Sequence, residues 1–266
     1  MKKELLVIKL GGAVVTYKDS STPKARVSTI KRLIKEIKQV TDQGYRIILV
    51  HGAGSFGHGL VKQYGLHHGM KTEEQKLVFG MVTNSMMNLN SIIKYHLHRA
   101  NLKTVGLPPH TFITQSGGKL NEFETKLIET YLKHGQIPVL FGDMVLDDRW
   151  GCSVLSGDTI VCYLGNKLRA DKVIFLSDVD GIFDADPNKN PQAKLIPEIT
   201  NANISQVLKG LSPTGRDDVT GEMAGKILQI QKNLKQISVQ ILNGLKPDNL
   251  IEALGQHQIG TKLQLK

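Results

Sequence analysis

The chain has 266 residues, of which 40% are hydrophobic and 5% aromatic, and its net charge is +10 at pH 7. This length can bury the core of one large α/β domain or of two small ones. No apolar run approaches the roughly 20 residues that span a bilayer, and the first twelve residues contain too short an apolar stretch for a signal peptide. Two cysteines, Cys152 and Cys162, fit neither a disulfide framework nor a zinc pattern. We therefore expect a cytoplasmic protein with no membrane partner.

The positive charge is concentrated near the N-terminus, where residues 1–50 hold 11 Lys and Arg against 4 Asp and Glu. A basic surface can bind nucleic acid, acidic membrane or small anionic ligands. Aromatic residues do not alternate with the basic ones, so platforms for stacking bases are not expected. A solvated helix face over residues 26–38 explains much of the surplus. We expect no nucleic-acid partner, and we assign a few particular lysines to an anionic ligand.

The first predicted strand, Leu5–Leu10, is apolar except for Lys9 and ends at the pair Gly11-Gly12. A lysine near the end of a buried strand is unfavourable unless an anion meets it. Glycines let a ligand approach the backbone, whose N–H groups can then bind phosphate. Lys18 follows a short apolar step and would return over this loop, although a surface lysine fits the pattern equally well. This segment predicts a phosphate-binding loop.

A second glycine-rich turn follows a helix at 27–40 and a buried strand at 46–50. Residues 50–60 read VHGAGSFGHGL and contain four glycines and two histidines. The pattern G-x-G-x-x-G is present, but no strand ending in an acid follows it, as a dinucleotide-binding fold requires. We therefore expect this turn to bind phosphate rather than NAD, and we assign His51 to bracing it.

The longest predicted helix covers residues 71–99, with Thr72 as its N-cap. Its apolar face includes Phe79, Val82 and Met86 at three- and four-residue steps, a spacing that suits either the core or the wall of an apolar pocket. Shorter elements are predicted after it: a strand at 104–107, a helix at 125–134, a strand at 137–140 and a hairpin at 144–155.

The C-terminal part of the chain alternates helices and strands. Ser156 or Asp158 caps a helix that ends near residue 168, and the strand that follows ends in two carboxylates, where open α/β sheets bind ligands. Residues 201–219 are polar and are expected to be irregular. The remaining predicted elements are the strand at 172–176, a helix at 220–236, a strand at 239–242 and a helix at 247–254. This alternation predicts one α/β domain over residues 1–266, an αβα sandwich with a mostly parallel sheet.

Two phosphate loops, three lysines and three aspartates at strand or helix ends meet the needs of phosphoryl transfer, which are positioning and cations around the transferring group. These charged residues are Lys9, Lys18, Lys226, Asp158, Asp178 and Asp180.

Six motifs, in consistent order between residues 5 and 262, resemble the amino acid kinase superfamily. They are KLGG at 9–12, HGAGSFGH at 51–58, FGD at 141–143, SGD at 156–158, DVDG at 178–181 and DDVTG at 217–221. The ending SFGH is similar to the isopentenyl phosphate kinase family specifically, whereas KLGG and DVDG indicate only the superfamily.

The resemblance implies a kinase that transfers phosphate from ATP, with Mg²⁺ carried on the ATP phosphates, to isopentenyl phosphate. The N-terminal part would bind the acceptor, and the part from about residue 157 the nucleotide. We also expect a homodimer. On the acceptor side the resemblance assigns Ala53, Gly54, His58 and Gly157. On the ATP side it assigns Lys9, Gly11, Gly12, Ala13, Lys18, Gly54, Asp158, Asp178, Asp180, Gly181, Gly221, Gly225 and Lys226.

Three residues are expected to act in catalysis: Lys9, Lys18, which would stabilise the transition state, and His58. A phosphomonoester has a second pKa of about 6 and is already mostly dianionic at neutral pH, so it needs no general base. His58 would therefore donate a hydrogen bond to the acceptor phosphate. We place the apolar tail of the acceptor against Phe79, Val82 and Met86, with core packing as the alternative for each.

Two positions depart from the family pattern, both on the ATP side. Ala13 stands where the family often has Ser, and Glu222 stands where it often has Gly. A fosfomycin-type phosphonate kinase of the same superfamily is the alternative function. A non-catalytic nucleotide- or RNA-binding protein is a third interpretation, which intact Lys9, Lys18 and Asp158 argue against.

Overall fold

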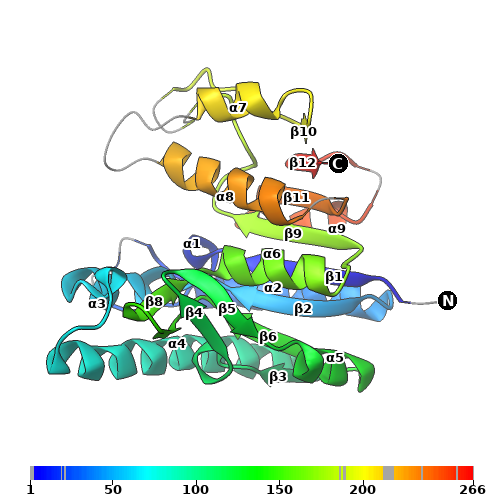
Figure 1. The fold of residues 1–266 in the computed structure, drawn as a ribbon. Helices are drawn as coiled ribbons and strands as arrows, with labels where there is room; N and C mark the ends of the chain where they lie inside the picture. The colour runs from blue at the N-terminus through cyan, green and yellow to red at the C-terminus, as the bar shows by residue number, and fades with distance from the viewer. Residues whose placement is uncertain are drawn as a thin grey trace.

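The central sheet of the protein has eight strands in the order β10-β12-β11-β9-β1-β2-β6-β3 (Figure 1). The computed structural model describes residues 3–18, 20, 22–185, 187, 190–211, 219–234, 236–255 and 257–265. The strands are β1 (Leu5–Leu10), β2 (Arg46–His51), β3 (Thr104–Gly106), β6 (Ile137–Phe141), β9 (Lys172–Ser177), β10 (Glu198–Thr200), β11 (Ser238–Asn243) and β12 (Thr261–Gln264). Neighbours from β11 to β3 are parallel, and β12 runs antiparallel to β11.

Helices cover both faces of this sheet, which confirms the predicted αβα sandwich. On one face α2 (Val27–Asp42), α4 (Glu73–Arg99) and α9 (Asn249–Glu252) pack on a core that includes Ile30, Met86 and Leu250. On the other face α5 (Lys126–Lys133), α6 (Gly157–Lys167), α7 (Ile204–Gly210) and α8 (Val219–Asn233) contribute Ile128, Ile160, Ile204 and Ile227.

A smaller sheet covers part of the N-terminal half, in the order β5-β4-β7-β8. Its hairpin of β7 (Asp143–Asp147) and β8 (Gly151–Leu155) was predicted, whereas β4 (Ile113–Ser116) and β5 (Lys119–Phe123) were not. The strand β5 is mostly exposed, so it lacks the apolar run that indicates a buried strand. Short helical turns complete the fold: α1 (Gly12–Val15), α3 (His58–Gln63), η1 (Gly54–Phe56), η2 (Leu66–His68) and η3 (Pro109–Thr111).

Helix starts follow the predicted caps. Thr72 caps α4 and accepts a hydrogen bond from the backbone N–H of Gln75, whose side chain bonds back to complete a capping box. Ser156 caps α6 by accepting from the backbone N–H of Thr159, which leaves Asp158 available for another role.

The prediction that residues 201–219 are irregular is wrong in part, since α7 begins at Ile204 and ends at Gly210. Only Ile204 and Val207 of this helix are buried, too few to make its period visible in the sequence. The strands β10 and β12 were also missed, because three or four residues at a sheet edge carry little pattern. None of the described helices is long and apolar enough to cross a membrane.

Candidate active site

The two glycine-rich loops, predicted separately, touch each other. They follow β1 and β2, adjacent parallel strands whose register pairs Leu10 with His51, so both loops emerge at one edge of the sheet. A Cβ atom on Gly12 would lie 2.7 Å from the backbone N of Gly54, and one on Gly52 would lie 2.5 Å from that of Gly12. Only glycine permits this contact of one main chain with the other. The fold thus brings two phosphate-binding candidates together.

The side chain of Thr16 forms hydrogen bonds with both glycine loops. Its buried hydroxyl donates to the carbonyl of Gly12 at 2.8 Å and accepts from the backbone N–H of Ser55 at 3.1 Å. Gly54 has φ +51° and sits so close that a Cβ there would meet the Thr16 hydroxyl at 1.9 Å. Sequence reasoning missed Thr16, because a threonine after an apolar step has no distinctive pattern.

His51 braces the second loop, as expected. It is buried and stacks on Phe141, with the ring centroids 5.1 Å apart. Burial lowers the pKa of its imidazole to about 4, so the ring is neutral at pH 7. The side-chain amide of Asn90 on α4 lies 3.2 Å from Nε2, and Nδ1 lies 3.1 Å from the carbonyl of Gly52. Because the amide donates to Nε2, the proton is assigned to Nδ1, which donates to the loop.

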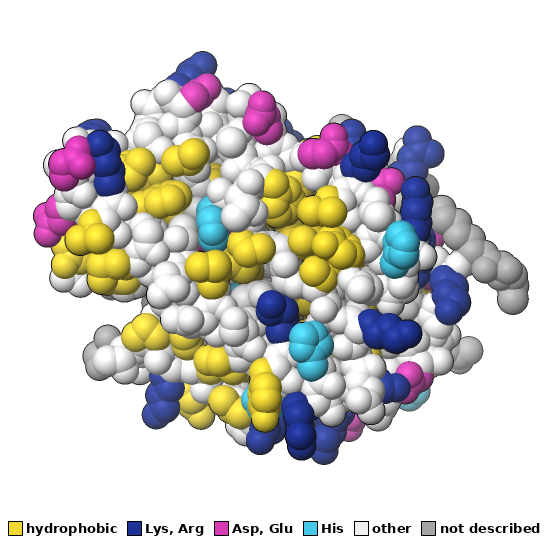
Figure 2. All heavy atoms as spheres, turned by 90° about the horizontal axis from the view of Figure 1, so that it is seen from below, with side chains coloured by type: hydrophobic (Ala, Val, Ile, Leu, Met, Phe, Trp, Pro, Cys, Tyr) yellow, Lys and Arg dark blue, Asp and Glu magenta, His cyan; other side chains and the backbone are white. Residues whose placement is uncertain are grey.

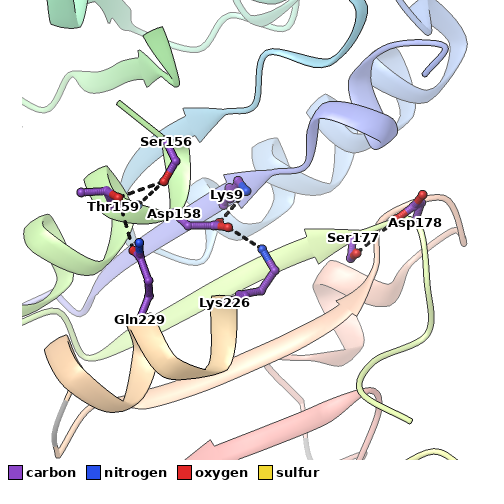
Figure 3. A network of polar contacts seen from close by, with 8 residues as sticks. All are labelled: Lys9, Ser156, Asp158, Thr159, Ser177, Asp178, Lys226 and Gln229. Carbon is purple, nitrogen blue, oxygen red and sulfur yellow. Dashed lines mark hydrogen bonds and ion pairs between the residues drawn. The ribbon is translucent and has the colours of Figure 1, made fainter. Parts of the chain in front are cut away.

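A carboxylate between two lysines lies beside these loops (Figure 3). Asp158 of α6 contacts Nζ of Lys9 on β1 at 2.5 Å and Nζ of Lys226 on α8 at 2.6 Å. All three side chains are largely buried, with exposed fractions of 19%, 13% and 9%. Burial favours protonation of Asp158, but the charges and hydrogen bonds of both lysines outweigh it and lower the carboxyl pKa below its usual range. One net positive charge remains.

A hollow lies next to this cluster and is lined by residues from both halves of the chain. Its walls come from the first glycine loop, the ends of β1 and β9, and α8. Those residues are Lys9, Gly11, Gly12, Ala13, Lys18, Phe175, Leu176, Ser177, Asp178, Val179, Met223 and Lys226. The hollow therefore contains all three predicted lysines together with the first glycine pair. Cations and backbone N–H groups are the donors that phosphates require.

Other residues predicted on the nucleotide side lie outside this lining. Burial raises the pKa of Asp180, but hydrogen bonds from Lys246 (2.8 Å) and Asn243 (3.0 Å) and the Lys246 charge outweigh it and keep that pKa below its usual value. Gly181 follows it, and Gly221 and Gly225 lie on α8. The first two residues of the motif at 217–221 lie outside the described residues.

The predicted acceptor residues gather around the second loop. His58 is exposed and is the first residue of α3, directly after Gly57. A Cβ atom on Gly57 would lie 2.8 Å from that of Ala53 and 3.3 Å from Sδ of Met86. A Cβ atom on Gly157 would lie 3.3 Å from Cε of Lys9. The same atom would lie 3.5 Å from the carbonyl oxygen of His51, so Gly157 lies beside both Lys9 and the start of the second glycine loop.

The three residues expected at the apolar tail divide between two clusters. Met86 belongs to the main core beneath the glycine loop. Val82 is buried in a small separate cluster, against which the half-buried Phe79 packs. That cluster also contains Leu66, Val78, Met144 and Cys152, which sequence reasoning did not connect with the site.

Sequence reasoning also missed the apolar walls of the first hollow. Nζ of Lys226 lies 5.3 Å from the ring centroid of Phe175 on β9, and Val179 and Met223 line the same space. Such residues look like ordinary core residues in a sequence, and only the fold places them beside the lysines.

Comparisons with known proteins identify the family of this chain. The model of the amino acid kinase family matches residues 4–243. Isopentenyl phosphate kinase of Methanothermobacter thermautotrophicus is 33% identical, over 97% of this chain and 98% of that one, and its counterpart from Methanocaldococcus jannaschii is 34% identical, over 97% and 98%. A solved structure of isopentenyl phosphate kinase superposes with a TM-score of 0.85 at 30% identity, covering 98% of this chain and 100% of the other. The chain belongs to the amino acid kinase family.

Proposed function

We propose that this protein transfers the γ-phosphoryl group of ATP to isopentenyl phosphate and so forms isopentenyl diphosphate, a step of isoprenoid biosynthesis. The observation that carries the proposal is the contact between the two glycine loops beside Lys9, Asp158 and Lys226. Two phosphate sites that share a wall hold donor and acceptor close together, which phosphoryl transfer needs. Relatives named isopentenyl phosphate kinase, aligned over nearly their whole length, support this acceptor.

On the donor side, the backbone of Gly11 and Gly12 and the amines of Lys9, Lys18 and Lys226 would hold the phosphates of ATP. The lining of the hollow fits the phosphates of ATP, because it contains three cations and a glycine turn. Among the described residues, its one acidic residue is Asp178, which is exposed. Mg²⁺, carried on the ATP phosphates, would supply further neutralisation of charge. Asp158 would keep Lys9 and Lys226 at fixed positions, so that neither amine has to reorganise during transfer.

On the acceptor side, the loop from Ala53 to His58 would bind the phosphate of the substrate. His51 donates to the carbonyl of Gly52 directly before this loop, and Asn90 donates to the other ring nitrogen of His51, so the loop would be held in place before the substrate arrives. His58, exposed at the start of α3, would donate a hydrogen bond to the phosphate. Gly157 would leave room between this phosphate and Lys9.

The test of the proposal is consumption of ATP by the purified protein with isopentenyl phosphate, fosfomycin or isopentenol as acceptor, with the products separated by chromatography. We expect turnover with isopentenyl phosphate and formation of its diphosphate. Preferred turnover of fosfomycin would transfer the assignment to the phosphonate kinases, and absence of turnover with every acceptor would contradict a catalytic role.

Lys18→Ala is expected to lower kcat more than it raises the KM for ATP. Lys18 is exposed at the rim of the hollow, and its contact would strengthen as charge moves onto the bridging oxygen. Lys18→Arg should restore little, since a planar fork does not replace a compact ammonium group. Steady-state kinetics measure both constants. A change in KM alone would assign Lys18 to binding rather than to chemistry.

Phe79→Ala and Met86→Ala are expected to admit ten-carbon prenyl phosphates, if these side chains close the tail pocket. Each methylene that the short tail no longer packs should weaken its binding by about 0.8 kcal/mol at most. The measurement is the ratio of kcat/KM for geranyl phosphate to that for isopentenyl phosphate. A constant ratio together with a lower Tm would show that the residue serves only the core. This control matters most for Met86, which is buried in the core.

We further propose a homodimer formed through the outer face of α4 and strand β3. Residues 77–93 contain no Lys, Arg, Asp or Glu, and Leu77 and Met81 are 68% and 47% exposed there. Among the described strands β3 pairs only with β6, so its other edge is open. Hydrophobic side chains gather in patches on this face of the molecule (Figure 2). A twofold partner would cover both the uncharged helix face and the open edge.

Light scattering should therefore give about twice the chain mass of 29.4 kDa. Met81→Glu should yield a monomer, because it would place two like charges near a twofold axis, and Leu127→Glu on α5 is the matched control. A monomeric wild-type protein would contradict this assembly.

A further inference from the structure

A second hollow, of about 390 Å³, lies between α2 and the C-terminal end of α4. It shares no lining residue with the hollow beside the glycine loops. Lys31 and Lys35 line it from α2, and His96 and Arg99 from α4. The rest of the lining is apolar or aromatic: Ile34, Ala100 and the 59% exposed Tyr95. Its volume is within the range of small-molecule sites.

The cations of this hollow have no acidic partner. No Asp or Glu lines it, and within the described part of the chain none of Lys31, Lys35 and Arg99 forms an ion pair. Their neighbours on α2 differ, since Arg32 pairs with Glu36 and Lys38 with Asp42. The lysines of α2 that face the hollow are therefore the ones without a counter-charge.

The positive charges of this hollow affect the neighbouring His96. Burial lowers the pKa of this imidazole, and the charges of Lys31 and Arg99 lower it further. At neutral pH the ring is therefore uncharged and offers one hydrogen-bond donor and one acceptor. The three like charges that line the hollow repel one another, and an anion bound between them would offset that repulsion.

We propose that the hollow between α2 and α4 binds an organic diphosphate. Three cations match the charge of about −3 on a diphosphate monoester, whereas a monophosphate with about −2 leaves one cation uncompensated. Ile34, Ala100 and the ring of Tyr95 provide an apolar wall for the organic group. The ligand class follows from charge and lining alone. The further identification of this ligand with the product of the reaction rests on the proposed function.

A single tryptophan placed at the hollow provides a local reporter. The chain has one tryptophan, Trp150, which is 46% exposed and can be replaced by Phe, while Tyr95→Trp introduces the new fluorophore. We expect saturable quenching or enhancement with inorganic diphosphate and with isopentenyl diphosphate, measured without Mg²⁺ at 150 mM salt. Arg99→Ala and Lys31→Ala should each raise the Kd about tenfold or more, because each removes a charge-assisted hydrogen bond. Lys133→Ala on the exposed side of α5 is the control and should leave the Kd unchanged.

The other outcomes overturn the proposal. An equal response to sulfate at the same ionic strength would indicate an adventitious ion only. A response to RNA or to vesicles of phosphatidylglycerol, with none to either diphosphate, would assign the cations to a macromolecular partner. Circular dichroism of each variant excludes misfolding as the cause of lost binding. Because fluorescence does not depend on turnover, failure here is distinguishable from failure of the kinase assay.

Discussion

Replacement of His58 by Ala is expected to reduce turnover roughly 30- to 1000-fold. A charge-assisted hydrogen bond to a transferring group contributes about 2–4 kcal/mol to the transition state, and each 1.4 kcal/mol changes the rate about tenfold. His58 begins α3 directly after the glycine loop and is exposed, so removal of its ring leaves the core intact. The measurement is kcat with isopentenyl phosphate and saturating ATP.

Two further variants serve as a test of partial rescue and as a matched control. His58→Gln retains a donor on a side chain of similar reach and should recover part of the lost rate. His134→Ala removes an exposed histidine at the end of α5 and should have no effect. If His58→Ala turns over like the wild type, the acceptor phosphate is held by backbone groups alone and the assignment of His58 is wrong.

Asp158→Asn should destabilise the protein and reduce its activity together. The change leaves Lys9 and Lys226 buried side by side without a counter-charge, and removal of one partner of a buried ion pair costs about 3–5 kcal/mol. For a chain of this size that corresponds to a fall in Tm of roughly 6–20 °C. The effect should be fully present at neutral pH, since both lysines lower the pKa of the carboxyl and keep it ionised there.

ATP provides the discriminating measurement. Its phosphates would supply negative charge to the same two amines, so the difference in Tm between wild type and Asp158→Asn should narrow when Mg-ATP is added. Asp178→Asn is the matched control, because Asp178 lines the same hollow but is exposed and bonds only to Ser177 among the described residues. An equal loss of stability in both variants would contradict the bridging role of Asp158.

Several parts of the site could be predicted because their signals are local. Glycines directly after an apolar strand predict a phosphate loop wherever the strand lies in the sheet, and both Gly11-Gly12 and the glycine-rich turn at 50–60 have this local signal. The caps of α4 and α6 are also local, since the capping side chain and its partner lie within three residues. The αβα architecture followed from alternation of strands and helices.

The sequence by itself determined which residues can bind phosphate, because glycine turns and lysines at strand ends have that chemistry in any fold. Only the tertiary structure decided how they meet. Parallel pairing of β1 with β2 placed Gly12 against Gly54, and docking of α8 beside α6 carried Lys226 to Asp158, which had been expected as a helix cap or a nucleotide contact. These two contacts join residues that are 42 and 68 positions apart in the chain. Periodicity reports only which face of an element is buried, so the register and neighbours of each element depend on packing of the whole core.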